Sequence, residues 1–173
     1  GKIGQLIAGY GKAFGMHVMI WGSEASRAKA AGDGFVPAAT REAFFEQSDV
    51  LSLHLRLHES THGIVTLNDL SRMKNTALIV NTSRAELIEA DALISALNRG
   101  HPGLAAVDVF ETEPILQGHA LLRLESCICT PHIGYVEQDS YEMYYGAAFD
   151  NVVNFIRGTP TNIVNPGALQ VRR

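Results

Sequence analysis

Residues 77–81 (A-L-I-V-N) and 104–109 (L-A-A-V-D-V) are nearly continuous apolar runs, and they decide the fold. Strands covered by helices on both faces have this composition, whereas strands of a one-sided sheet alternate apolar and polar residues. Other strand-like apolar runs lie before and after them, at 17–21, 49–55 and 127–130. The sequence therefore predicts a set of buried parallel strands.

Helical patterns separate these runs. We expect helices at 40–46, 67–72, 90–98 and 136–156, after a periodic helix in the first residues. Thr40 and Thr66 are suitable N-caps, and Asp69 completes a capping box with Thr66. Gly100 and Gly158 end the last two helices. Strands that alternate with helices predict an α/β fold with a doubly wound parallel sheet.

The composition is that of one globular domain of ordinary size. The chain has 173 residues, of which 46% are hydrophobic and 18% charged, and its formal net charge is -4. That charge argues against a nucleic-acid partner, because phosphate binding needs a basic patch. No apolar run approaches the roughly 20 residues of a membrane span, and no secretory signal is visible. Cys127 and Cys129 are therefore expected as reduced thiols of a cytoplasmic protein.

The first residues, G-K-I-G, match the second half of a dinucleotide-binding fingerprint. In the pattern G-x-G-x-x-G, the glycines allow a tight turn and bring backbone N–H groups to the pyrophosphate. Gly1 and Gly4 take the second and third positions, whereas the first glycine and the strand before it are missing. We therefore expect a dinucleotide-binding domain that lacks its first strand. A simpler reading is that Gly4 only permits close helix packing.

The residue that reads the adenosine ribose is expected at the end of the 17–21 run. Asp or Glu at this place accepts hydrogen bonds from the 2'-hydroxyl of NAD. The sequence has Trp21, Gly22, Ser23 and Glu24 here, so Glu24 is one candidate. Ser23 together with Arg27 could instead hold the 2'-phosphate of NADP. NAD is the expected cofactor, and NADP stays open.

Three segments follow successive apolar runs: N-T-S-R-A-E-L from Asn81, D-V-F-E-T-E-P from Asp108 and T-P-H-I-G from Thr130. Open α/β sheets bind their ligands at the carboxyl ends of strands. In order and placement, the segments resemble those of the D-isomer-specific 2-hydroxyacid dehydrogenases, which include phosphoglycerate, glycerate and D-lactate dehydrogenases. The resemblance covers nearly the whole chain. It implies a Rossmann-type fold and hydride transfer between a nicotinamide cofactor and a small-molecule D-2-hydroxy or 2-oxo acid.

The resemblance implies a catalytic set of Arg84, Glu113 and His132, and the residue types suit the chemistry. A guanidinium grips carboxylate and carbonyl oxygens through a fork of donors. An imidazole gives or takes the proton at the substrate oxygen, because it titrates near neutrality. Glu113 would orient the His132 ring through a hydrogen bond. Glu111 competes for that role, but the family pattern places the functional carboxylate directly before Pro114.

The resemblance also implies contacts with the cofactor. Asp108 is expected at the nicotinamide carboxamide, and the backbone N–H groups of Lys2 and Ile3 at the pyrophosphate. The expected cofactor-binding set is Gly1, Lys2, Ile3, Gly4, Ser23, Leu55, Arg56, Thr82, Ser83, Asp108, His132 and Gly134. His54, His58 and His62 recur at helical spacing, but they lie at a strand end and in a loop, so no metal site is expected.

Residues 1–157 are expected to form the dinucleotide-binding domain, and residues 158–173, rich in Pro, Asn and Gly, an extended C-terminal tail. The family's substrate domain is built mainly from sequence before the glycine fingerprint and is absent here. These residues alone are therefore expected to turn over poorly. The resemblance implies a homodimer. The alternative function is a nucleotide-sensing or protein-binding module, as in the family's corepressors.

Overall fold

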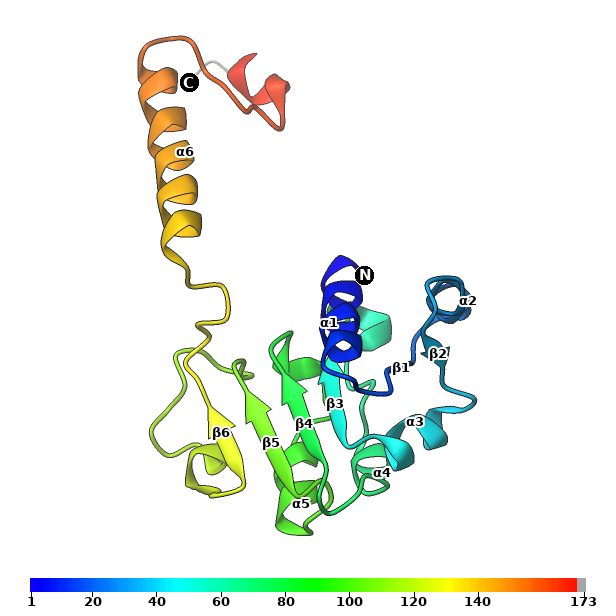
Figure 1. Cartoon of the computed structure of the whole chain (residues 1–173). Helices are drawn as coiled ribbons and strands as arrows, with labels where there is room; N and C mark the ends of the chain where they lie inside the picture. Colours follow the sequence, from blue (N-terminus) through cyan, green and yellow to red (C-terminus); the bar gives the residue numbers. More distant parts are fainter. Residues whose placement is uncertain (171–173) are drawn as a thin grey trace. The chain divides into compact units, whose positions relative to one another are not determined.

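The computed structural model describes residues 1–170, which form two compact units (Figure 1). The first unit ends at His132 and the second begins at Ile133. The first unit contains every site residue expected from the sequence except Gly134. No helix in the described part of the chain is long and apolar enough to cross a membrane.

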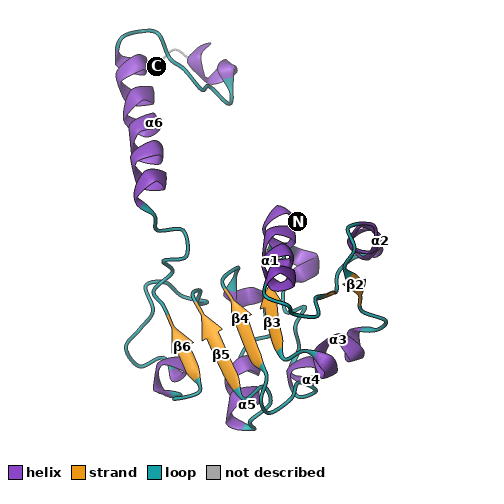
Figure 2. Cartoon of the chain, viewed as in Figure 1, coloured by secondary structure: helices purple, strands orange, loops and turns teal. Residues whose placement is uncertain are grey.

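A four-stranded parallel sheet forms the centre of the first unit (Figure 2). Its strands lie side by side in chain order: β3 (Val50–Leu53), β4 (Leu78–Asn81), β5 (Leu104–Val107) and β6 (Cys127–Cys129). The register places Val50 beside Leu78, and Leu78 beside Leu104. The predicted parallel strands are confirmed, although β3, β5 and β6 end one or two residues before their apolar runs do.

The core of this unit lies between the sheet and its helices. The helices are α3 (Arg41–Gln47), α4 (Leu67–Leu70) and α5 (Ala92–Asn98). Side chains of β4 alternate across the sheet, so Ile79 is fully buried while Leu78 and Val80 are half-buried on the opposite face. α4 and α5 begin or end two residues from the predicted bounds, and Gly100 ends α5 with φ +76°.

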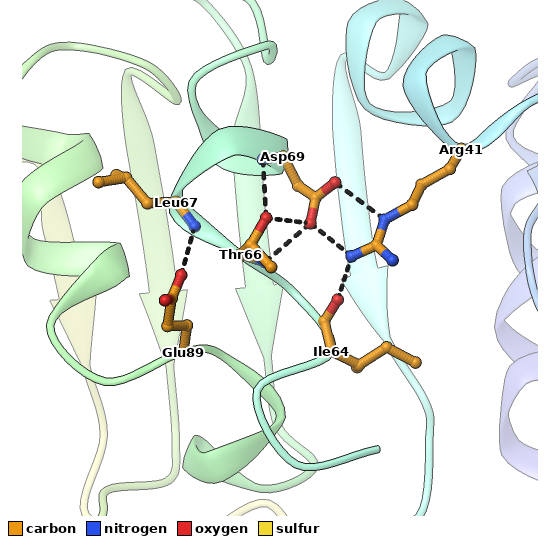
Figure 3. Close-up of polar contacts among 6 residues, drawn as sticks. All are labelled: Arg41, Ile64, Thr66, Leu67, Asp69 and Glu89. Carbon is orange, nitrogen blue, oxygen red and sulfur yellow. Dashed lines mark hydrogen bonds and ion pairs between the residues drawn. The ribbon is translucent and has the colours of Figure 1, made fainter. Parts of the chain in front are cut away.

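Polar contacts tie α3 to the start of α4 (Figure 3). Arg41 donates to both carboxylate oxygens of Asp69, over 2.9 Å from Nε and 2.6 Å from Nη2, and it also donates to the carbonyl of Ile64. Asp69 accepts further hydrogen bonds from the backbone N–H and the hydroxyl of Thr66, at 2.8 and 2.7 Å. The predicted capping box of Thr66 and Asp69 is confirmed, as is the N-cap at Thr40.

A second, smaller parallel sheet contains β1 (Met19–Ile20) and β2 (Val36–Pro37). It is accompanied by α1 (Lys2–Ala13), as predicted, and by α2 (Glu24–Gly32). The sequence does not predict α2, because this helix consists of small and charged residues without an apolar stripe. It does not predict β2 either, because this strand has two residues and one is a proline. β1 is also shorter than the predicted run at 17–21.

The chain winds outward in two directions from the space between β1 and β3. On one side β1 is followed by β2, and on the other β3 is followed by β4, β5 and β6. This is the predicted doubly wound order, with no strand at the point where the winding reverses. Among the described residues, no strand pairing joins the two sheets.

The second unit contains one long helix, α6 (Gln138–Ile156), which starts two residues after the predicted position. Glu137 caps it by accepting from the N–H groups of Asp139 and Ser140, at 3.0 and 2.8 Å. Gly158, with φ +75°, follows its end as predicted. The predicted extended tail is wrong for Pro166–Gln170, which form a 3-10 helix, and its last three residues lie outside the described part.

Candidate functional site

The three sequence motifs meet at the carboxyl edge of the four-stranded sheet. Residues 82–84 follow β4, residues 108–113 follow β5, and residues 130–132 follow β6. Because β4, β5 and β6 are adjacent and parallel, their carboxyl ends lie at the same edge. This is the edge at which open α/β sheets bind their ligands.

The side chain of Asn81, the last residue of β4, fixes the loop that follows this strand. This side chain is 2% exposed; its amide donates to the carbonyl of Arg84 over 2.9 Å, and its oxygen accepts from the N–H of Ser83 over 3.0 Å. The Ser83 hydroxyl donates to the carbonyl of Leu55 over 2.7 Å, which joins this loop to the end of β3. The backbone is thereby fixed while the Arg84 side chain stays exposed. Sequence reasoning missed the role of Asn81; the available signal was a polar residue that ends an apolar strand.

His132 and Glu113 form a direct pair, with 2.7 Å between Nδ1 of the ring and Oε2 of the carboxylate. The other carboxylate oxygen of Glu113 accepts from the N–H of Phe110 over 3.0 Å. His132 itself lies in the left-handed region, with φ +55°. Both carboxylate oxygens are therefore engaged, which fixes the carboxylate that orients the imidazole.

The electrostatics of this pair favour an ionised carboxylate. Hydrogen bonds from His132 and from the Phe110 backbone lower the pKa of Glu113, with the hydrogen bond from His132 the larger cause. The positive charge of Arg84 lowers the pKa of Glu113 further, as the smallest of these causes. The structure therefore brings the three predicted catalytic residues to one edge of the sheet, where His132 and Glu113 are paired.

Glu111, the competing carboxylate, contacts a different histidine. Its Oε2 lies 3.7 Å from Nε2 of His119, a residue whose ring packs edge-on against Phe110. The two acidic residues of the loop thus serve two separate histidines, and it is Glu113 that contacts His132.

Asp108 is bonded both to Asn81, at the end of β4, and to Thr130, after β6, and its exposed fraction is 4%. Its N–H donates to the carbonyl of Asn81 over 3.0 Å, and its carboxylate accepts from the hydroxyl of Thr130 over 2.5 Å. Thr130 is a second residue whose role the sequence did not reveal. The available signal in the sequence was a hydroxyl residue directly after β6. Its hydrogen bond to Asp108 depends on the pairing of β5 with β6, which the sequence alone does not give.

A cavity of about 810 Å³ adjoins α1, β1 and the end of β3. Five residues of the expected cofactor-binding set line it, namely Gly1, Lys2, Gly4, Ser23 and Leu55. The other residues of the set in the first unit do not line this cavity, namely Ile3, Arg56, Thr82, Ser83, Asp108 and His132, and Gly134 belongs to the second unit. The cavity therefore collects residues expected at the pyrophosphate and the adenosine of the cofactor. The residues expected at the nicotinamide lie outside it.

The start of α1 has the donors that a pyrophosphate requires. The first N–H groups of a helix lack partners within it, and Gly1 provides no side chain to cap them. A Cβ at Gly4 would lie 3.5 Å from Cβ of His54, an ordinary contact, so helix packing alone does not demand glycine there. The backbone at this site thus fits a nicotinamide dinucleotide.

The residues expected to contact the adenosine ribose, Glu24 or Ser23 with Arg27, follow β1 in the chain. Glu24 is the first residue of α2, and the Ser23 hydroxyl caps that helix by accepting from the N–H of Ser26 over 3.3 Å. Arg27 stacks its guanidinium 4.7 Å from the centre of the Trp21 ring. The position that would carry the usual acidic residue is Gly22, which also lines the cavity.

The three regularly spaced histidines lie on no common helix face. His54 follows β3, while His58 and His62 flank the 3-10 turn Glu59–Thr61. Among residues 1–170, no three His, Cys, Asp or Glu side chains form a group suited to a metal ion. Cys127 and Cys129 are free thiols, as predicted, with 3.7 Å between their sulfurs.

Known proteins match both the sequence and this geometry. Residues 1–134 match the family described as D-isomer specific 2-hydroxyacid dehydrogenase, NAD binding domain. The chain is 36% identical over 175 residues to a glyoxylate reductase of Korarchaeum cryptofilum, covering 99% of this chain and 52% of that protein. It is 35% identical over 165 residues to a hydroxypyruvate reductase of Blautia hydrogenotrophica, covering 95% of this chain and 51% of that protein.

Solved structures of related proteins have the same fold over most of this chain. A phosphoglycerate oxidoreductase from Vibrio cholerae matches with a TM-score of 0.86 and 54% identity, over 91% of this chain and 50% of that chain. A D-lactate dehydrogenase from Aquifex aeolicus, solved with NAD and lactic acid, matches with a TM-score of 0.73 and 30% identity, over 92% of this chain and 52% of that chain. The chain spans about half the length of these relatives. It belongs to the D-isomer specific 2-hydroxyacid dehydrogenase family and carries that family's NAD-binding domain.

Proposed function

We propose that this chain is the cofactor-binding part of an oxidoreductase that interconverts small D-2-hydroxy acids and 2-oxo acids. The observation that carries the proposal is the 2.7 Å contact between His132 and Glu113 at the edge where Arg84 also stands. An acid–base pair beside a fixed cation suits a substrate with a carboxylate next to a carbonyl. The matched glyoxylate and hydroxypyruvate reductases bear names of the same reaction class.

The cofactor in this proposal is NAD, held at its pyrophosphate by the start of α1. Gly1, Lys2 and Gly4 line the cavity there, and the free N–H groups of the helix supply hydrogen bonds. Ser23 lies at the adenosine end, and Asp108, Thr82 and Ser83 at the nicotinamide end. When bound, the reduced cofactor supplies the hydride that reduces the substrate carbonyl.

The three side chains then have separate tasks. Arg84 binds the carboxylate of the 2-oxo acid through its guanidinium and holds the carbonyl in line. His132 gives its proton to the carbonyl oxygen as negative charge develops there, and removes that proton in the oxidative direction. Glu113 accepts a hydrogen bond from the opposite ring nitrogen, so it orients the imidazole.

The test uses the full-length protein that contains this chain, because we propose that a separate substrate domain completes the site. Oxidation of NADH is followed with glyoxylate, hydroxypyruvate and pyruvate. His132→Ala and Arg84→Ala are expected to lower kcat/KM by about 10²- to 10⁴-fold. His119→Ala is the matched control, because this histidine pairs with Glu111 instead and should leave kcat/KM within about twofold.

A different result would point to the family's other use of this fold. If the full-length protein binds NADH but oxidises it with none of these acids, the binding-module alternative replaces the enzyme. The 173 residues alone are expected to bind NADH and to turn over poorly. Substantial turnover by this material would contradict the need for a substrate domain.

The assembly and location of the protein belong to the same proposal. We expect residues 1–157 to act as the dinucleotide-binding domain of a cytoplasmic homodimer, with residues 158–173 as its tail. Exposed apolar side chains along α6, such as Tyr145, Phe149 and Ile156, support association through a larger interface. Sedimentation of the full-length protein distinguishes a dimer from a monomer.

A further inference from the structure

Two thiols lie side by side on the last strand of the four-stranded sheet. β6 is hydrogen-bonded to β5 alone, so it is a terminal strand of this sheet (Figure 2). Cys127 and Cys129 are its first and third residues, and side chains two residues apart on a strand share one face. Their sulfurs are 3.7 Å apart, and both side chains are half-buried. The proposed catalysis uses neither thiol, so this pair is a second cluster of chemically active side chains.

The pair lies between the core and the solvent. Both cysteines pack against the hydrophobic core, whereas Ile128, between them in the sequence, lies on the opposite face and is 69% exposed. Among the described residues, the hydrogen-bond partners of the two sulfurs are each other and the carbonyl of Ile128, 3.9 Å from Sγ of Cys127. Thiols are weak donors and acceptors, so these contacts leave both sulfurs available to a stronger ligand.

The backbone of β6 disfavours a disulfide between these thiols. Alternate residues of a strand are about 6.6 Å apart along it, at about 3.3 Å per residue. A disulfide brings its two Cβ atoms to about 3.5–4.5 Å, so β6 would have to contract. Pairing with β5 opposes contraction, because Cys127 lies beside Ala105 and Cys129 beside Val107, whose carbonyl also accepts from the N–H of Thr130 over 3.0 Å. The sulfurs are therefore close, while the backbone positions hold them apart from a direct S–S bond.

The separation of the sulfurs is that of two ligands of one zinc ion. Zinc–thiolate bonds are about 2.3 Å long, so tetrahedral coordination places two sulfurs about 3.7–3.8 Å apart. The observed 3.7 Å corresponds to an S–Zn–S angle of about 107° with such bonds. An ion can therefore bond both sulfurs without a change in the strand.

Charge decides which class of ion suits the pair. Burial and the neighbouring sulfur raise the pKa of Cys127 to about 12, so an ion has to displace a proton from this thiol. Two thiolates and one divalent cation form a neutral group, whereas two thiolates alone would be like charges in a half-buried place. Thiolate ligands favour zinc and its heavier analogue cadmium over magnesium and calcium, which prefer oxygen.

We propose that Cys127 and Cys129 form a binding site for one thiophilic divalent cation, with zinc as the expected ion. Two S–H bonds break and two Zn–S bonds form, both protons pass to the solvent, and nothing is oxidised or reduced. Among residues 1–170, no third His, Cys, Asp or Glu side chain completes the site, so water takes the other positions. With two protein ligands we expect a moderate affinity, with a Kd on the order of 10 µM. The inference does not depend on the proposed catalysis, because neither cofactor nor substrate takes part in it.

Cadmium chloride is the probe, because cadmium–thiolate bonds give an ultraviolet charge-transfer band that bonds to nitrogen and oxygen do not. The reduced, metal-free full-length protein that contains this chain is titrated at pH 8. The difference from the double variant Cys127→Ser/Cys129→Ser should correspond to one ion per chain, and zinc chloride should displace it. Each single variant should weaken the affinity at least about tenfold, because one of two protein ligands is lost. Ile128→Ser is the matched control; it keeps both thiols and should leave the affinity within about twofold.

A second measurement needs no substitution, so it does not depend on the folding of a variant. Iodoacetamide alkylates the half-buried thiols of the metal-free protein, and mass spectrometry follows Cys127 and Cys129 separately. Saturating zinc should slow alkylation of both at least about tenfold, because a coordinated sulfur is no longer a free nucleophile. A chelator should restore the rate, and magnesium at the same concentration should not change it.

The proposal is overturned if the double variant keeps the full cadmium band, or if zinc leaves the rate of alkylation unchanged. It is also overturned if Ile128→Ser lowers the affinity as much as Cys127→Ser does, because the effect would then come from the strand and not from the thiols. Absence of NADH oxidation with every 2-oxo acid would contradict the proposed catalysis alone, because both thiol measurements are made without cofactor or substrate.

Discussion

The four-stranded sheet and the region before it are built in opposite ways. The buried core of the molecule lies entirely between Phe45 and Leu121. In residues 1–40 only three alanines, at 8, 30 and 38, are buried, while Leu6, Tyr10 and Phe14 of α1 are 60%, 59% and 83% exposed. Burial of apolar area is the main favourable contribution to folding, so most of the folding free energy belongs to the four-stranded part.

This difference separates the two halves of the proposed site. Arg84, Glu113 and His132 lie in loops that follow strands with a core of their own, so we expect their positions not to depend on the first residues. The pyrophosphate donors of α1 stand on a part whose apolar side chains face a groove and the solvent. Substitutions that destabilise the region of α1 should therefore affect cofactor affinity, whereas the arrangement of the catalytic side chains should depend on the core of the four-stranded part.

Cavity formation in the core gives the largest expected effect. Ile79→Ala, at a fully buried position of β4, should lower the free energy of unfolding by about 2–5 kcal/mol. Leu6→Ala, at an exposed position of α1, should change it by less than about 0.5 kcal/mol. Urea unfolding followed by circular dichroism measures both. Equal losses would contradict the contrast between the two parts.

Hydrogen exchange tests the same contrast without substitution. Amides of β4 and β5 that pair within the four-stranded sheet should exchange at least about 100-fold more slowly than those that pair β1 with β2, because the smaller sheet opens without disrupting the core. The comparison uses Val80 and Val107 against Val36 and Ala38. Similar protection in both sheets would mean that the gap between them is closed in solution.

The ion pair between α3 and α4 has a smaller effect and depends on pH. Burial raises the pKa of Asp69, but hydrogen bonds from Arg41 and Thr66 outweigh it, so the net pKa is below 3.8. A lowered pKa adds stability above the unfolded-state value and loses it as the pH falls through the folded-state value. Asp69→Asn should cost about 2 kcal/mol at pH 6, discounted because Arg41 is partly exposed.

The matched control for Asp69 is Glu46→Gln, in an exposed pair with Arg72. This substitution should cost less than about 0.5 kcal/mol. The difference in stability between the natural protein and Asp69→Asn should shrink as the pH is lowered from 6 to 3. A difference that stays constant over this range would show that Asp69 acts by packing rather than by charge.

The same division between the two parts explains what the sequence could predict. The strands that pack against the core are visible in the sequence as apolar runs. For this reason β3, β4, β5 and β6 were predictable to within a few residues. α2 and β2 were not, because an alanine-rich helix and a two-residue strand with a proline have no periodic pattern. The expected grouping of Arg84, Glu113 and His132 came from the resemblance to the family, which rests on three motifs that follow successive strands. Asn81 and Thr130 act through contacts across strands, which spacing along the chain does not encode.

The smallest effect concerns the His–Glu pair itself, at the rim of the stable part. The pKa of Glu113 is lowered chiefly by its hydrogen bond from His132 and least by the charge of Arg84. His132→Ala should therefore raise the carboxyl titration midpoint of Glu113 toward 4.5, and Arg84→Ala should raise it less. Carboxyl ¹³C chemical shifts across a pH titration measure both. Because both side chains of the pair are partly exposed, neither variant should move the urea midpoint. If Arg84→Ala shifts Glu113 more than His132→Ala does, the carboxylate is positioned for the arginine and not for the imidazole.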